Sequence, residues 1–402
     1  MSPLKRRSGW FMGGLVIGIL LVVMIVALVS QTGWGRERAL GFTLKTLGGQ
    51  LNGKLIVERL EGNLLTGARL YEITLNDADG DLFLSADSAY LDYQLPTFFG
   101  GDIVIERLVV YDPDLYLRKL PGDTAWNYQE IFADTTPSTG NPRATLVDLA
   151  EFVDGLVIVR GTWEPEGDLT GTAREVAIEE ALSDTSRLLV ERVPGGFVRT
   201  MRFEELDAVA SRILISGDER GGKYLQIDNI STLAYVWATP ARIERGRGEV
   251  LLRGDLVQFR ATPLVLPESQ AALWGTVSFT DDAPRYDVHA RGEEVALSDL
   301  QWIYPPFPSE GTVTGDLWFE TRDEGMFYEV HDLTLRAPGT VIEGEASLVF
   351  GDTLRFLNAD LEAEPLRVET VQQMLPIDIP VEGLRIGAAE IHALDDPGES
   401  GN

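Results

Sequence analysis

The sequence contains no cysteine, only three histidines, and far fewer basic than acidic side chains: 34 Lys and Arg against 63 Asp and Glu in 402 residues. The absence of cysteine excludes disulfide bonds, thiol nucleophiles, thiolate metal sites and iron–sulfur clusters. The formal net charge of −29 argues against nucleic acid as a partner, because a phosphate backbone binds clustered Lys and Arg. Long amphipathic helices are also missing from the sequence pattern.

Motifs for catalysis or cofactor binding are absent as well. His289, His331 and His392 are far apart, and none has a metal-ligand spacing. The sequence has no G-x-S-x-G elbow and no GxxxxGK[ST] loop, and Gly246-Arg247-Gly248 lacks the third glycine of a dinucleotide fingerprint. Adjacent acidic residues such as Glu179-Glu180 point to opposite faces of a strand, so they do not indicate the paired carboxylates of a glycosidase. We therefore expect no enzymatic activity, no cofactor and no metal.

The run Asp77-Ala78-Asp79-Gly80-Asp81 is similar to part of a calcium-binding loop. It lacks a convincing glutamate at the twelfth position of such a loop. Asp-Gly is also a frequent dipeptide of tight turns between strands. We expect a hairpin turn at this position, with a calcium loop as the alternative.

An uncharged run of nineteen residues, Phe11 to Val29, is the clearest positive signal. A helix of this length spans roughly 28 Å, close to the ~30 Å hydrocarbon core of a bilayer. Three basic residues at positions 5–7 precede the run, so the positive-inside rule places the N-terminus in the cytoplasm. A cleaved signal peptide is the alternative, although its apolar core is usually only about 7–15 residues long. We expect an uncleaved anchor that includes Phe11, Leu15, Ile19, Val23, Val26 and Val29.

Beyond the anchor the hydrophobic pattern has mainly period two, which predicts antiparallel strands with one apolar and one polar face. Turn dipeptides recur about every ten residues, among them Gly100-Gly101 and Pro338-Gly339. With few helices to cover them, the apolar faces must form a closed core, pack on a second sheet or present an apolar groove. The candidate lining of a groove is Leu91, Ile103, Ile105, Val277, Phe279, Val288, Val313, Leu317 and Phe319.

Short helices are expected in only three places, near residues 36–47, 297–303 and 368–375. Residues 164–200 are rich in Glu, Gly and Thr and are expected to form exposed hairpins. The fold class predicted from these patterns is mainly β: one N-terminal transmembrane helix, then an elongated antiparallel β-groove with a few short helices.

An internal repeat supports the elongated shape. The pattern Pro…Pro-x-Glu-Gly-x-x-x-Gly occurs within 305–315 and, in related form, within 376–387, each time after two strands and a short helix. Repeated supersecondary units imply a fold that grows by stacking. The predicted sections are 1–35 (cytoplasmic tip and anchor), 36–134 (N-terminal β domain), 135–145 (loop), 146–272 (middle section), 273–341 and 342–392 (two β repeats) and 393–402 (acidic tail).

Several short motifs behind the anchor, in the same order, resemble the AsmA-like superfamily, which includes AsmA and TamB. Residues 61–70 (EGNLLTGARL) are similar to its G-x-L-x-G-x-R-L pattern, and residues 85–91 (SADSAYL) to the segment that follows it. Residues 103–115 (IVIERLVVYDPDL) are similar to i-x-i-x-x-l-x-l-x-x-P-x-l. Trp126-Asn127 matches a frequent Trp-Asn pair, and residues 152–158 (FVDGLVI) resemble the strand that begins the next section.

The resemblance implies an inner-membrane protein of bacteria with two membranes, whose periplasmic part is a taco-like β-groove with an apolar concave face. Proteins of this superfamily are proposed to carry phospholipids between the inner and outer membranes, or to help outer-membrane proteins assemble. The expected partners are therefore the inner membrane, phospholipid, and an outer-membrane protein or assembly factor. TamB-like members are much longer and end in a characteristic domain, so this chain is expected to be a short member or a truncated one.

Overall fold

The fold was analysed in a computed structural model. The structure describes residues 52–63, 67–94, 103–131, 145–165, 170–183, 189–216, 222–236, 240–253, 256–278, 285–350, 354–374, 385–386 and 389–394. The predicted anchor (11–29), the helix predicted at 36–47, nearly all of the predicted loop 135–145 and most of the acidic tail lie outside these residues. Among the helices that the structure describes, none is long and apolar enough to cross a membrane.

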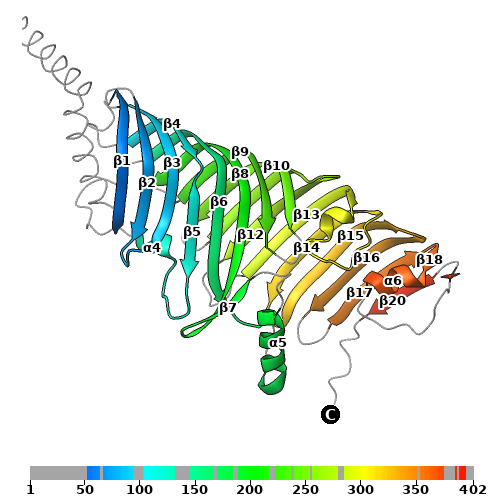
Figure 1. The fold of residues 1–402 in the computed structure, drawn as a ribbon. Coiled ribbons are helices and arrows are strands. Elements are labelled where there is room, and N and C mark those ends of the chain that lie inside the picture. The colour runs from blue at the N-terminus through cyan, green and yellow to red at the C-terminus, as the bar shows by residue number, and fades with distance from the viewer. Residues whose placement is uncertain are drawn as a thin grey trace, which may run out of the picture.

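Eighteen of the described strands form one elongated, twisted sheet (Figure 1). In chain order these strands are β1 (Gly53–Asn63), β2 (Gly67–Asp77), β3 (Leu82–Tyr93), β4 (Ile103–Tyr111), β5 (Asp114–Lys119), β6 (Thr145–Trp163), β7 (Val190–Val193), β8 (Gly196–Ser216), β9 (Gly222–Tyr235), β10 (Ala241–Arg253), β11 (Leu256–Val265), β12 (Gln270–Ser278), β13 (Arg285–Ala296), β14 (Thr312–Arg322), β15 (Gly325–Ala337), β16 (Thr340–Phe350), β17 (Leu354–Ala363) and β20 (Ala389–Leu394). β18 (Leu366–Arg367) and β19 (Arg385–Ile386) form a separate pair. The prediction of a mainly β fold is confirmed.

From β8 to β17 each strand pairs with the next along the chain in antiparallel fashion, so this part of the sheet is a meander. The prediction of a wholly antiparallel sheet is wrong, because β4 and β5 both pair with β6 in parallel. A parallel pair needs a long crossover. The connection from β5 to β6 has the length for one, since it includes helix α4 (Asn127–Ile131) and residues 132–144.

Bulges interrupt many strands and bend them. At several of these bulges a non-glycine residue has a positive φ of 50–55°: Asp154, Glu205, Glu294 and Asp332. A bulge adds one residue to one strand, so the alternation of side chains continues beyond it in the opposite phase. In β15, for example, Val330 and Leu333 lie on the same side of the sheet although they are three residues apart.

The helices only partly follow the expected pattern. The helix predicted near 368–375 is α6 (Val368–Met374), whereas 297–303 contains only the short 3-10 helix η2 (Ser298–Leu300). Within 164–200 the hairpin β7–β8 is present, but the prediction of hairpins throughout is wrong, because α5 (Gly171–Ser183) is a helix that projects from the sheet (Figure 1). No residue of α5 is buried. No apolar stripe therefore marks it, and its Ala, Glu, Arg and Leu residues favour a helix by intrinsic propensity alone.

The internal repeat has a structural counterpart at one edge of the sheet. Asp299 of η2 accepts a hydrogen bond from the amide of Glu268 (3.0 Å) and so holds the turn between β11 and β12. Thr370 of α6 donates to the carbonyl oxygen of Pro338 (2.7 Å) at the turn between β15 and β16. Asp299 and Thr370 are 71 residues apart, as are Pro267 and Pro338 in the two turns.

The sheet runs without a break through the predicted section boundaries. The boundary at 272/273 lies inside β12, and the boundary at 341/342 lies inside β16. The two repeats are also joined at their helical edge, where the Tyr304 hydroxyl donates to the carbonyl oxygen of Met374 (2.5 Å).

Compact clusters of buried side chains lie in the N-terminal part of the described sheet. One contains Val57, Ile73, Ala86, Ala89 and Val110 from β1 to β4. In the other, Ile131 of α4 is fully buried against Leu75 and Phe83. Here a helix does cover the apolar side of the strands.

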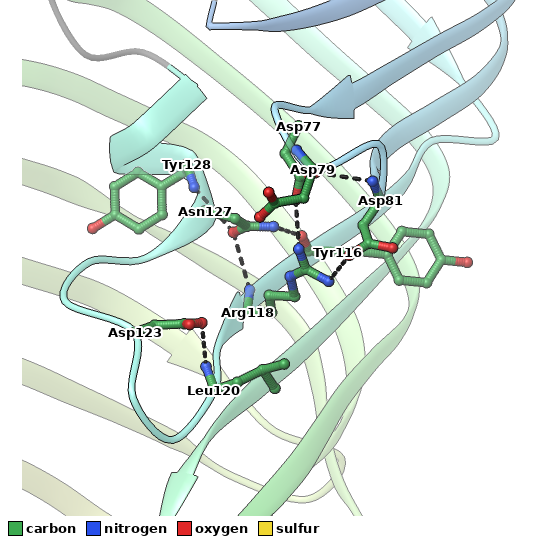
Figure 2. Close-up of polar contacts among 9 residues, drawn as sticks. All are labelled: Asp77, Asp79, Asp81, Tyr116, Arg118, Leu120, Asp123, Asn127 and Tyr128. Atoms are coloured by element: carbon green, nitrogen blue, oxygen red, sulfur yellow. Dashed lines mark hydrogen bonds and ion pairs between the residues drawn. The ribbon is translucent and has the colours of Figure 1, made fainter. Parts of the chain in front are cut away.

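Asn127, from the Trp-Asn pair of the sequence motif, holds α4 against β5. Its Nδ2 donates to the carbonyl oxygen of Tyr116 (2.8 Å), and its Oδ1 accepts from the amide of Arg118 (3.0 Å). Both bonds join the start of the helix to the backbone of the strand (Figure 2).

The acidic run 77–81 forms the turn between β2 and β3, as predicted (Figure 2). Asp77 Oδ1 accepts hydrogen bonds from the amides of Asp79 (3.1 Å) and Asp81 (2.9 Å). The Arg118 guanidinium contacts both Asp77 Oδ2 (2.8 Å) and Asp81. A protein cation thus lies between these carboxylates, and the described residues contain no group of His, Asp and Glu side chains arranged to hold a metal ion.

Replacing Arg118 by alanine should destabilise this part of the sheet. The Asp77 side chain is only 5% exposed and would lose its charged partner. We expect the free energy of unfolding to fall by about 1–3 kcal/mol, because a nearly buried carboxylate would keep only its two backbone hydrogen bonds and lose its cationic partner. Denaturant unfolding measures the change. Asp81→Asn is the matched control: the Asp81 side chain is 59% exposed, and its loss should cost less than ~1 kcal/mol.

Candidate functional site: the apolar face of the sheet

One side of the sheet is uncharged across six neighbouring strands. Residues directly opposite each other in adjacent strands have side chains on the same face, so the strand registers define the two faces. Among the described residues, one face of β12–β17, hereafter the apolar face, contains Ala271, Leu273, Gly275, Val277, Tyr286, Val288, Ala290, Val295, Val313, Gly315, Leu317, Phe319, Met326, Tyr328, Val330, Leu333, Leu335, Ile342, Gly344, Ala346, Leu348, Ala359, Leu361 and Ala363.

The apolar face continues toward the N-terminus. Val277 lies opposite Val257 of β11, and Phe259 lies opposite Val250 of β10. Val250 in turn lies opposite Leu225 of β9. The face is therefore a continuous strip across the strands, at right angles to their direction.

The other face of the same strands, the outer face, carries the charges. Asp287 and Arg291 of β13 lie opposite Glu320 and Asp316 of β14, and Asp316 lies opposite His331 of β15. The strands from β12 to β17 are thus strongly two-sided, and only their charged side is typical of a solvated surface.

The apolar face is less deeply buried than a closed core. Val288 and Val295 are buried (3% and 5% exposed). The larger side chains beside them, including those of Leu317, Phe319 and Leu348, are only half-buried. Large aliphatic and aromatic residues of a closed core are usually fully buried. The exposure of these side chains indicates that no second layer of the described chain packs on the face between β14 and β16.

Tyr286 of β13 lies on the apolar face, is 36% exposed and responds to a charge on a distant strand. Burial raises the pKa of the Tyr286 hydroxyl, and the positive charge of Arg199 partly offsets this rise. Arg199 belongs to β8, which is separated from β13 by four strands. The positive charge of Arg199 thus acts on the Tyr286 end of the apolar face, although the two residues belong to strands that are not neighbours in the sheet.

The described lining candidates all lie within sheet regions where apolar residues face each other. Leu91 lies opposite Ala68 and Leu108 and packs against the buried cluster of β1–β4. Ile105 lies opposite Tyr93 and Val147. The structure brings five further candidates together on the apolar face of β12–β14, namely Val277, Val288, Val313, Leu317 and Phe319. Phe279 and the side chain of Ile103 lie outside the described residues.

Of the 24 residues named above for the apolar face, sequence reasoning identified five and missed nineteen, twelve of them in β15–β17. Leu333, Leu335, Ile342, Leu348 and Leu361 all lie on it. The alternation of β16 would have identified Ile342 and Leu348, whereas the bulge at Asp332 hides the shared face of Val330 and Leu333 in a simple period-two count.

A ladder of three aromatic rings stabilises the outer face. The His289 ring is stacked between Trp274 and Trp318, with ring centroids 5.6 and 5.7 Å apart and interplanar angles of 7° and 5°. The Trp318 indole N–H also donates to Asp287 (2.9 Å). The ladder joins β12, β13 and β14, which carry most of the lining candidates.

Removing the central ring should loosen these three strands. We expect His289→Ala to lower the free energy of unfolding by about 1–2 kcal/mol, because two stacked cross-strand pairs are lost. His289→Phe, which keeps a ring between the two indoles, should retain most of the stability. Denaturant unfolding followed by tryptophan fluorescence distinguishes the two variants, and equal loss in both would contradict a stacking role.

Comparisons with protein-family models, with curated proteins and with solved structures found no match to this chain. The fold and the site define the protein by class: a mainly β protein built on one long mixed sheet, with an uncharged, half-exposed face on one side of it.

Proposed function

We propose that this chain is an inner-membrane-anchored periplasmic protein of the AsmA-like kind, which carries phospholipid acyl chains along its apolar face between the inner and outer membranes. The observation that carries the proposal is the continuous, uncharged and half-exposed face of β12–β17. With its continuation to β9 it runs across the strands, so it offers one apolar path along this part of the sheet.

Such a path requires no catalytic group. Each methylene that leaves water for an apolar surface gains about 0.8 kcal/mol. An acyl chain that slides from one strand to the next keeps this gain, since the residues it meets are again apolar. The headgroup stays in water at the edge of the sheet, where the charged residues of the outer face begin.

The membrane location rests on the sequence. The uncharged run from Phe11 to Val29, with basic residues before it, suits a single-pass anchor with a cytoplasmic N-terminus. The motif order behind this run resembles the AsmA-like superfamily and supports a place in envelope biogenesis. The sheet would then lie in the periplasm, beginning soon after the anchor.

Photo-crosslinking from single positions of β14 tests the proposal. Leu317 lies on the apolar face and its neighbour Trp318 on the outer face. A photoreactive amino acid at 317 in the full chain, irradiated in cells, should give adducts with phospholipid that mass spectrometry detects, and the same group at 318 should not. Equal lipid adducts at the two positions, or none at either, would contradict the proposal.

A second candidate, a non-catalytic assembly factor for outer-membrane proteins, is favoured by the edge of the sheet. Within the described chain β1 pairs only with β2, so its other edge can accept an added strand. A photoreactive group at Ile56 of β1 distinguishes the two functions. Adducts with outer-membrane proteins at 56, without lipid adducts at 317, would favour assembly over lipid transport.

A further inference from the structure

The section from β12 to α6 has a strong and uneven charge. Residues 270–374 contain twenty acidic residues, six arginines and no lysine. This section therefore supplies six cationic side chains to a headgroup that travels along its apolar face, and Arg199 of β8 adds a positive charge near Tyr286 at the start of β13. Whether those six can bind a phosphate depends on what they already contact.

Each of the six arginines already has a carboxylate of the protein as its partner. On the outer face, Arg291 pairs with Asp316 at 2.5 Å, and this contact raises the pKa of the guanidinium and lowers the pKa of the carboxyl group. The other five pairs have N–O distances of 3.0–3.9 Å and are Arg285–Asp323, Arg322–Glu320, Arg336–Glu343, Arg355–Glu324 and Arg367–Glu369.

Because all six arginines are paired with carboxylates, the excess charge of this section is negative and is carried by Asp and Glu side chains. An anionic headgroup would have to displace a protein carboxylate from an arginine and then remain among uncompensated negative charges. An ammonium group would find many carboxylate acceptors instead. The side chains that β12–β17 contribute to the apolar face are themselves uncharged.

We infer that the lipid carried on this face is a zwitterionic phospholipid whose headgroup bears an ammonium group, such as phosphatidylethanolamine, and that anionic phospholipids are disfavoured. This inference rests on the proposed lipid-carrying function. It adds a headgroup preference, set by the carboxylate surplus and by the pairing of all six arginines.

Substitutions in the turn between β14 and β15 should weaken the headgroup preference. Asp323, whose side chain is 97% exposed, pairs with Arg285, and Glu324 pairs with Arg355. The double variant D323N/E324Q removes two negative charges and frees two arginines at one edge of the apolar face. The matched control is E179Q/E180Q on α5, which removes the same charge from a helix with no buried residue.

The experiment incubates the full-length protein with vesicles of phosphatidylethanolamine and phosphatidylglycerol, mixed equally and with identical acyl chains. The lipids that co-purify with the protein are counted by mass spectrometry. We expect phosphatidylethanolamine to be enriched about threefold or more, with a larger ratio at low ionic strength. D323N/E324Q should bring the ratio toward one, and E179Q/E180Q should leave it unchanged.

Two results would overturn the inference in distinguishable ways. Lipid bound at an equal ratio, or enriched in phosphatidylglycerol, contradicts the headgroup preference and leaves the carrier function intact. Absence of both lipids contradicts the carrier function and the preference together. An equal fall of the ratio in both double variants also contradicts the inference, because net charge alone would then set the ratio.

Discussion

Replacing Phe319 by aspartate should abolish lipid binding without unfolding the sheet. Phe319 is a half-buried residue in the middle of the apolar face, opposite Val288 and Tyr328. A carboxylate at this point would lie where acyl chains are proposed to pass, and its desolvation by a bound chain is strongly unfavourable. We expect co-purifying phospholipid to fall at least about tenfold, which corresponds to ~1.4 kcal/mol of binding free energy. Val277→Asp, two strands away on the same face, should act in the same way.

The matched pair Leu348→Asp and Ser347→Asp separates the effect of the face from the effect of an added charge. The two residues are neighbours in β16, with Leu348 on the apolar face and Ser347 on the outer face. Only Leu348→Asp should lose lipid. Circular dichroism checks that each variant retains its strand content. Folded Phe319→Asp and Leu348→Asp proteins with undiminished lipid would show that this face does not bind acyl chains.

The largest loss of stability should follow a substitution at Gly344 of β16. A Cβ atom at this position would lie 2.0 Å from the carbonyl oxygen of Asp360 in β17, and the φ angle of +136° is one that residues with a side chain rarely adopt. Gly344→Val therefore requires β16 and β17 to move apart. We expect a loss of more than ~3 kcal/mol, since both steric overlap and backbone strain contribute.

Ala346→Val is the control for Gly344→Val, because it adds volume to the same strand and the same face only two residues away. Ala346 already has a Cβ atom and an extended backbone, so the cost should stay below ~1.5 kcal/mol. Denaturant unfolding and limited proteolysis measure the difference. Similar stability of the two variants would show that the close approach of β16 and β17 at Gly344 is not required.

Gly344 is one of several glycines where neighbouring strands approach closely. A Cβ atom at Gly248 would lie 1.9 Å from the carbonyl oxygen of Arg260, and one at Gly275 would lie 2.2 Å from that of Asp287. Glycines within strands often mark sites where another backbone comes close, and together with bulges they allow a sheet to bend.

Local patterns were enough to predict the part of the site in β12–β14. The alternation around Leu317 and Phe319 correctly placed both on one face of a strand, and the same pattern identified Val277, Val288 and Val313. The hairpin at 77–81 followed from its Asp-Gly dipeptide, and α6 was predicted from its own residues. Each of these features depends on residues that are close in sequence, which is why the sequence reveals them.

Other features depend on contacts between distant residues. The sequence does not show that β4 and β5 pair with β6 in parallel, because this is decided by the crossover through α4. The sequence also does not reveal α5. This helix has no buried residue, so apolar residues do not recur at helical spacing along it. The sequence also conceals which side chains share a face beyond a bulge, as at Asp332.

The sequence by itself determined an acidic, cysteine-free chain of alternating strands behind an uncharged segment long enough to span a membrane. These properties follow from composition and from periodicity along the chain. Only the tertiary structure decided that the apolar residues of β12–β17 form one strip and that all six arginines of residues 270–374 are paired with carboxylates. Strand register and ion pairing join residues that are tens of positions apart, so they are set by how the sheet folds and not by any local pattern.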